Sequence, residues 1–121
     1  MTILETQGLA ARHAERVLAV AGTAQKNRAL EAIARALEER ESAILAENQK
    51  DLAAARESGM KASLLDRLAL NPERIAGMAQ GIREVAALPD PVGAVLQRVE
   101  RPSGIVVEKT AVPMGVIAII Y

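Results

Sequence analysis

The sequence contains no cysteine, no phenylalanine and no tryptophan, and its only aromatic residue is Tyr121. Without cysteine the chain has no disulfides, no thiolate nucleophile and no cysteine-based metal site. Without aromatic rings it lacks the platforms on which nucleic-acid bases stack, and its 15 basic residues are balanced by 15 acidic ones. We therefore expect no nucleic-acid partner.

Long apolar runs are also missing. The longest, Val116 to Ile120, is far too short to span a membrane. Residues 1–5 show no basic stretch leading into an apolar run, so the sequence predicts no signal peptide. Together these absences predict a cytoplasmic protein with no membrane partner.

Half of the 121 residues are apolar and almost all of these are aliphatic, which suits one domain with an aliphatic core. Up to about residue 93, apolar residues recur at spacings of three and four among strong helix formers, which predicts helices. Gly22 is expected to end the first helix, and Thr23 and Ser42 to begin the next two. A short helix is expected over residues 62–68, and Asn71 followed by Pro72 predicts the start of a fifth, which ends before Pro89.

Each of the four longer predicted helices has an apolar face that we expect to be buried. These faces comprise Ala10, Ala14, Val17, Leu18 and Ala21 in the first helix; Leu30, Ile33 and Leu37 in the second; Ile44, Leu45, Leu52 and Ala55 in the third; and Ile75, Met78, Ala79, Ile82, Val85 and Ala86 in the fifth. Glu31 and Arg35 are expected to pair on the outer side of the second helix.

After residue 93 the sequence becomes rich in β-branched residues. The turn signal Pro102-Ser103-Gly104 lies between Val95–Arg101 and Ile105–Val112, which predicts a hairpin. Val116–Ile120 is apolar on both faces, as in a central strand of a parallel sheet, yet neither a crossover helix nor a neighbouring strand follows Tyr121. We therefore expect an incomplete α/β fragment, with a helical segment over 1–93, a hairpin over 94–112 and the first strand of a parallel sheet within 113–121.

No polar residue has the partners that catalysis requires. His13 lacks a second histidine or a carboxylate cluster, and Asp66 with Arg67 is interpreted as a local ion pair rather than an anion clamp. The other candidates, which are interpreted as surface charges or as hydroxyls without a base, are Lys26, Glu38, Glu39, Glu41, Ser58, Ser63 and Ser103. Glycine-rich phosphate and dinucleotide motifs are absent. The sequence predicts no catalytic residue and no metal site.

Several segments carry a resemblance to a known family. They are Ile44–Leu52, Ser58–Met60, Leu64–Leu70, Leu88–Gly93 and Val112–Tyr121, which includes the run Pro113-Met114-Gly115-Val116. In this order they resemble the N-terminal region of the glutamate-5-semialdehyde dehydrogenases, also called gamma-glutamyl phosphate reductases, within the aldehyde dehydrogenase superfamily.

The resemblance implies a parent enzyme of proline biosynthesis, which reduces gamma-glutamyl phosphate to glutamate-5-semialdehyde with NADPH through a cysteine thiolate. Since this chain has no cysteine, the resemblance implies that the chain is not catalytic on its own. The Val116–Tyr121 strand resembles the strand whose C-terminal end borders the dinucleotide in the superfamily. This resemblance makes Ile120 and Tyr121 candidate cofactor-binding residues. An equal alternative is that Ile120 and Tyr121 only form part of the core of the sheet.

The Val95–Val112 hairpin resembles the oligomerisation flap of the superfamily, which extends a sheet in a neighbouring subunit. Its β-branched composition on both faces suits pairing at an exposed edge, so we expect a homo-oligomer. Two other hypotheses stay open at this point. One is a free-standing helical interaction module whose hairpin recruits a partner, and the other is the N-terminal part of a different aldehyde dehydrogenase relative with another acyl substrate.

Overall fold

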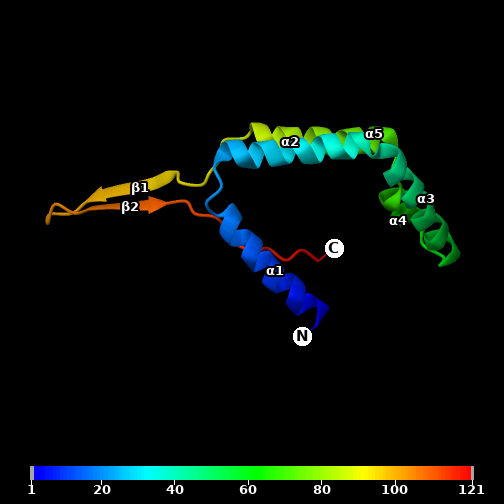
Figure 1. Ribbon diagram of the computed structural model, residues 1–121, viewed down its shortest axis with the longest axis horizontal. Helices are drawn as coiled ribbons and strands as arrows, with labels where there is room; N and C mark the ends of the chain where they lie inside the picture. Colours follow the sequence, from blue (N-terminus) through cyan, green and yellow to red (C-terminus); the bar gives the residue numbers. More distant parts are fainter. Residues whose placement is uncertain (1, 121) are drawn as a thin grey trace. The chain divides into compact units, whose positions relative to one another are not determined.

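The computed structural model describes residues 2–120. Within this range it contains five α-helices and one two-stranded antiparallel sheet (Figure 1). The elements are α1 (Ile3–Leu18), α2 (Thr23–Glu39), α3 (Glu41–Glu57), α4 (Ala62–Leu68), α5 (Pro72–Ala87), β1 (Val95–Glu100) and β2 (Val106–Thr110). Residues 24–88 form one compact unit, and the described parts of 1–23 and 89–121 form another. Among the described helices none is long and apolar enough to cross a membrane.

Helix α1 begins at a capping box, in which the Thr2 hydroxyl accepts from the Glu5 N–H and the Glu5 carboxylate accepts from the Thr2 N–H. It ends earlier than the sequence predicted. Ala19 closes the helix by donating its N–H to the Glu15 carbonyl, and Gly22 does not adopt a positive φ. The prediction that Gly22 is the C-terminal cap was therefore wrong.

The starts of the other helices follow local sequence more closely. Helix α2 begins at Thr23, and α4 spans the predicted 62–68. Asn71 caps α5 by accepting the Arg74 N–H at 2.7 Å, with Pro72 in the first turn. Helix α3 begins at Glu41 rather than at Ser42, and no side chain caps it.

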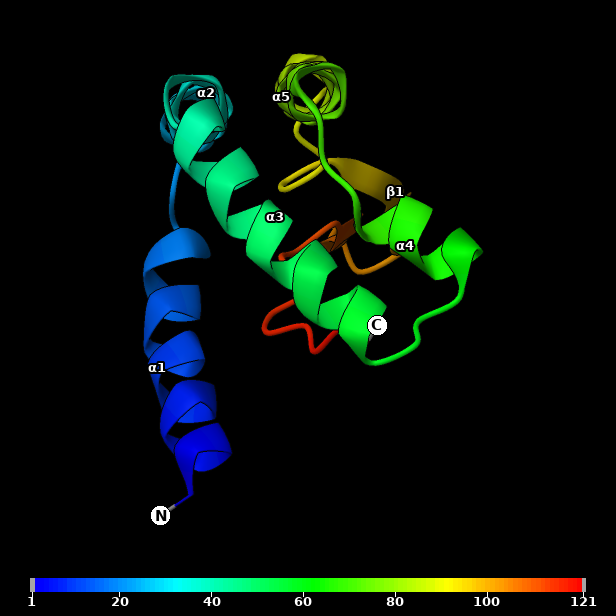
Figure 2. The same cartoon turned by 90° about the vertical axis from the view of Figure 1, so that its right-hand side faces the viewer.

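The core of the 24–88 unit is small and made mostly of alanine and leucine. Figures 1 and 2 show α2 and α5 side by side and antiparallel, with α3 and α4 at one end of the pair. The buried apolar residues of this unit are Ala34, Leu52, Ala55, Ile75 and Ala79. Of the residues predicted to be buried, Ile33, Met78 and Val85 are about half exposed. They are exposed because α2 and α5 bury only the strip along which they meet, and that strip is narrow.

Strands β1 and β2 form the predicted hairpin. Arg98 lies opposite Glu108 and forms an ion pair with it at 2.8 Å. A bulge at Leu96 places two residues of β1 against one of β2. Gly104 closes the turn with φ of 83° by donating its N–H to the Arg101 carbonyl.

Residues 111–120 have no regular secondary structure. The strand predicted at Val116–Ile120 is therefore not formed within the described chain. A parallel strand exists only through hydrogen bonds to neighbouring strands, and residues 2–120 supply no third strand to pair with it. The α/β prediction holds for the helices and the hairpin, whereas the parallel sheet is absent from the part of the chain that the structure describes.

Candidate functional site

Helices α3, α4 and α5 meet around the turn at residues 69–71. Asn48 of α3 is only 6% exposed, and it is the described polar side chain that lies in the core. Its Oδ1 accepts from the Leu70 N–H at 2.8 Å, and its Nδ2 donates to the Leu68 carbonyl at 3.0 Å. One buried amide therefore satisfies two backbone groups that the turn leaves without helical partners.

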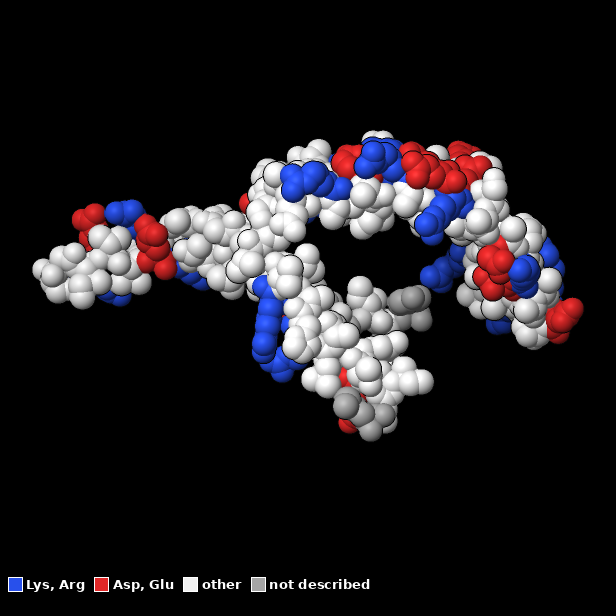
Figure 3. All heavy atoms as spheres, in the orientation of Figure 1, with Lys and Arg blue, Asp and Glu red and all other residues white. Residues whose placement is uncertain are grey.

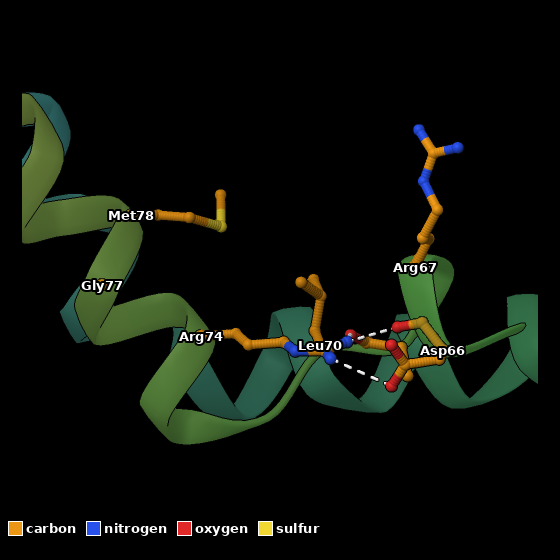
Figure 4. Close-up of a pocket in the computed structure, with 7 residues that line it drawn as sticks. Asp66, Arg67, Leu70, Arg74, Gly77 and Met78 are labelled. Atoms are coloured by element: carbon orange, nitrogen blue, oxygen red, sulfur yellow. Dashed lines mark hydrogen bonds and ion pairs between the residues drawn. The ribbon is translucent and has the colours of Figure 1, made fainter. Parts of the chain in front are cut away.

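Arg74 holds the same turn from the other side. Its guanidinium donates to the carbonyls of Asp66 and Ala69 and pairs with the Asp66 carboxylate at 3.0 Å (Figure 4). The predicted pair of Asp66 with Arg67 was wrong. Neighbouring helical residues do not face each other, and Figure 4 shows Arg67 extending away from Asp66.

An open hollow of about 530 Å³ lies beside this arginine. It is lined by Asp66, Arg67, Ala69, Leu70, Arg74, Gly77 and Met78. The Arg74 donors that border it are committed to backbone oxygens and to Asp66. This arrangement therefore fixes the α4–α5 connection, and the one carboxylate that lines the hollow, that of Asp66, is paired with Arg74.

A second charged cluster joins α2 to α5. The two terminal guanidinium nitrogens of Arg83, Nη1 and Nη2, donate to the Glu38 carboxylate at 2.7 Å, and its Nε lies 3.6 Å from the Glu31 carboxylate. The hydrogen bonds lower the pKa of Glu38 and raise the pKa of Arg83. Figure 3 shows acidic and basic side chains interspersed along this helix pair. Glu31 thus pairs across to α5, and the predicted partner Arg35 was wrong.

The remaining polar candidates gather into no site. His13 is exposed on α1, and Lys26 is half-buried in α2. The Ser58 hydroxyl donates to the Ala55 carbonyl at the end of α3. Across residues 2–120 no three metal-binding side chains come together.

Of the two cofactor candidates, Ile120 is fully exposed and Tyr121 lies outside the described residues. A dinucleotide requires a strand end and a helix N-terminus facing one crevice. The segment that holds Ile120 has no regular secondary structure and offers neither, so the described residues by themselves do not fit a dinucleotide.

Sequence reasoning missed three residues that organise this unit, namely Asn48, Arg74 and Arg83. For Asn48 a signal existed, because it lies four residues from both Ile44 and Leu52 and therefore on the apolar face of α3. For the two arginines no local signal existed, because each bonds to groups from another helix.

The amino-acid sequence of this chain is similar to those of known proteins. The chain is 54% identical over 118 residues to a gamma-glutamyl phosphate reductase of Moorella thermoacetica, and 55% identical over 120 residues to that of Methylocella silvestris. The matches cover 98% and 99% of this chain. Over nearly its whole length, this chain is similar to the N-terminal part of gamma-glutamyl phosphate reductases. No family model matches the chain.

Solved gamma-glutamyl phosphate reductases share its fold. The Thermotoga maritima protein matches with a TM-score of 0.82 at 44% identity over 85% of this chain, and the Saccharomyces cerevisiae protein with 0.86 at 33% over 93%. The chain spans 28% of the length of the Moorella and Methylocella reductases, and 25% and 29% of the two solved chains. Most of a gamma-glutamyl phosphate reductase therefore lies outside the 121 residues of this sequence.

Proposed function

We propose that this chain acts as the N-terminal part of an NADPH-dependent, cytoplasmic reductase that converts gamma-glutamyl phosphate to glutamate-5-semialdehyde in proline biosynthesis. The observation that carries the proposal is the 54–55% identity to gamma-glutamyl phosphate reductases over 98–99% of the chain. Identity at this level over the whole chain favours this reductase over another aldehyde dehydrogenase relative and over a free-standing module.

The chain contributes scaffold rather than chemistry to this reaction. It has no cysteine that could act as the nucleophile. The side chains of Arg74 and Arg83 are paired with carboxylates of neighbouring helices, Asp66 and Glu38. In the complete enzyme, Val116–Ile120 pairs with further strands of a nicotinamide-binding sheet. Ile120 and Tyr121 would then border the bound NADPH, which would supply the hydride.

The test replaces the matching segment of the Moorella reductase with residues 1–121 of this chain. The chimera is assayed in the reverse direction with NADP, phosphate and glutamate-5-semialdehyde. We expect turnover within about tenfold of the parent enzyme, and none from the isolated chain. A folded but inactive chimera, or turnover by the isolated chain, would contradict the proposal. The first outcome would favour the free-standing module.

The hairpin supports a second part of the proposal, which is a homo-oligomer formed through Val95–Val112. A two-stranded sheet is marginal alone and has two open edges. Val95, Leu96, Val106 and Val107 are 43–63% exposed on it. We propose that the hairpin extends a sheet in a second copy of the complete enzyme by strand addition.

The oligomer is tested in the same chimera by light scattering after size exclusion. Val106→Lys with Val107→Lys places charge on both faces of β2, because successive strand residues point to opposite faces. We expect these substitutions to reduce the mass to that of a smaller species. The control Gln97→Lys changes a residue of β1 that is already polar, and it should leave the mass unchanged. An unchanged mass in the double variant would refute this mode of assembly.

A further inference from the structure

The unit formed by the described parts of 1–23 and 89–121 buries no side chain of its own. No residue of α1 is buried, so the predicted burial of its apolar face is not met among the described residues. A polar contact joins the two stretches of this unit. Thr23 Oγ1 donates to Asp90 Oδ2 at 2.8 Å, across 67 residues of sequence. We call this hydrogen bond the Thr23–Asp90 anchor.

The backbone around Asp90 is stiff. Asp90 lies between Pro89 and Pro91, whose rings fix φ, and a residue that precedes proline is disfavoured in the helical region. Its second carboxylate oxygen, Oδ1, accepts from the Val92 N–H at 3.1 Å, the local turn that aspartate commonly forms with the residue two positions on. One carboxylate therefore binds both Thr23 and the backbone that leads into the hairpin.

The hairpin begins directly after this turn. Gly93 adopts φ of 87°, a conformation that a side chain disfavours. Its N–H donates to the Ala111 carbonyl, and the Ala111 N–H donates to the Ala94 carbonyl, each at 2.9 Å. We call Gly93, Ala94 and Ala111 the hairpin base. A short series of hydrogen bonds and stiff backbone thus connects the Thr23–Asp90 anchor to the two strands.

Such a connection matters for assembly. A hairpin on free connections would take many directions, and it would lose that freedom when it adds to the sheet of a partner. A hairpin whose base is held loses less conformational entropy on binding, so it binds more tightly through the same contacts.

From this geometry we infer that the Thr23–Asp90 anchor positions the hairpin for strand addition in a second copy of the complete enzyme. Thr23 and Asp90 are positioning residues, because they act through the hairpin base. The inference rests on the homo-oligomer of the proposed function and names the residues that hold its interface element in place.

The test uses the Moorella chimera. Thr23→Val removes the hydroxyl of the anchor, and Thr23→Ser keeps it. Thr6→Val is the matched control, since the Thr6 hydroxyl donates to the Thr2 carbonyl within its own helix. Sedimentation velocity over a concentration series measures the dissociation constant of the oligomer. Hydrogen exchange followed by mass spectrometry measures the protection of residues 91–94 and of the hairpin turn at 101–105.

We expect Thr23→Val to raise the dissociation constant about fivefold, the size expected for one lost hydrogen bond. It should also speed exchange at residues 91–94 and leave the hairpin turn unchanged. Thr23→Ser and Thr6→Val should change the dissociation constant by less than about twofold. Equal dissociation constants for Thr23→Val and Thr6→Val would overturn the inference, and so would a Thr23→Ser variant as weak as Thr23→Val.

A double-mutant cycle tests the pair itself. In the Asp90→Ala background, Thr23→Val should weaken association by less than about twofold, because the partner of the hydroxyl is already gone. Independent effects that multiply would contradict the anchor. An active, oligomeric chimera whose dissociation constant ignores Thr23→Val would refute the anchor alone. An unchanged mass of the variant with Val106→Lys and Val107→Lys would instead refute the proposed assembly, on which the inference rests.

Discussion

Asn48 and Leu70 are 22 residues apart in sequence and are joined by a hydrogen bond of 2.8 Å from the Leu70 N–H to Asn48 Oδ1. The amide nitrogen of the same side chain donates to the Leu68 carbonyl. A buried polar side chain that satisfies two backbone groups fixes the path of the chain between α4 and α5.

We predict that Asn48→Ala lowers the free energy of unfolding by about 2 kcal/mol, because it leaves a backbone donor and a backbone acceptor unsatisfied in a covered turn. Urea unfolding followed by circular dichroism measures the loss. Gln49→Ala is the control, since Gln49 is exposed on the same helix, and it should change the stability by less than about 0.5 kcal/mol. Equal effects of the two substitutions would show that the Asn48 bonds contribute nothing.

Arg74 is predicted to stabilise the connection between α4 and α5. Arg74→Gln removes the bonds to the Asp66 and Ala69 carbonyls and the pair with the Asp66 carboxylate, and we expect a loss of about 1 kcal/mol because the site is partly exposed. Arg67→Gln alters a neighbouring arginine that extends away from Asp66 and should have almost no effect. A larger loss for Arg67→Gln would contradict this assignment.

The ion pair of Glu38 with Arg83 predicts a pH dependence. The pKa of Glu38 is lowered by its hydrogen bonds from Arg83, so the folded chain binds fewer protons than the unfolded chain as this carboxylate titrates. The stabilisation is complete above the ordinary pKa of a glutamate and is lost as pH falls through the lowered pKa.

Unfolding midpoints measured from neutral pH downward in matched buffers test this dependence. Glu38→Gln should flatten the acid side of the profile, whereas Glu39→Gln, one residue along the same helix, should leave its shape unchanged. The assignment fails if the two profiles coincide.

Replacing glycine by alanine should change the free energy of unfolding in opposite directions at two positions. Gly59 ends α3 with φ of 76°, and Gly59→Ala should cost about 1 kcal/mol because a side chain is disfavoured at positive φ. Gly81 lies inside α5 with no atom within 4 Å of an added Cβ, so Gly81→Ala should stabilise the chain by about 0.5–1 kcal/mol. Thermal unfolding of both variants decides between these signs, and two changes of the same sign would contradict the backbone argument.

The sequence by itself determined the elements that depend on local interactions. The short helix at 62–68 follows from the spacing of its apolar residues. The start of α5 follows from capping by Asn71 and from the fixed φ of Pro72. The hairpin around Pro102-Ser103-Gly104 follows from its turn residues, since Gly104 adopts the positive φ that the turn requires. The absence of cysteine likewise shows that this chain supplies no thiolate.

Only the tertiary structure decided which apolar residues are covered and which charges pair. Ala34 and Ala79 are buried while Ile33 and Met78 are half exposed, because burial depends on where two helices meet and not on the hydrophobicity of a residue. Arg83 bonds to a carboxylate 45 residues away, a distance over which sequence gives no pairing signal. Val116–Ile120 has the composition of a central strand but does not form one here, because a strand is stabilised by the strands beside it.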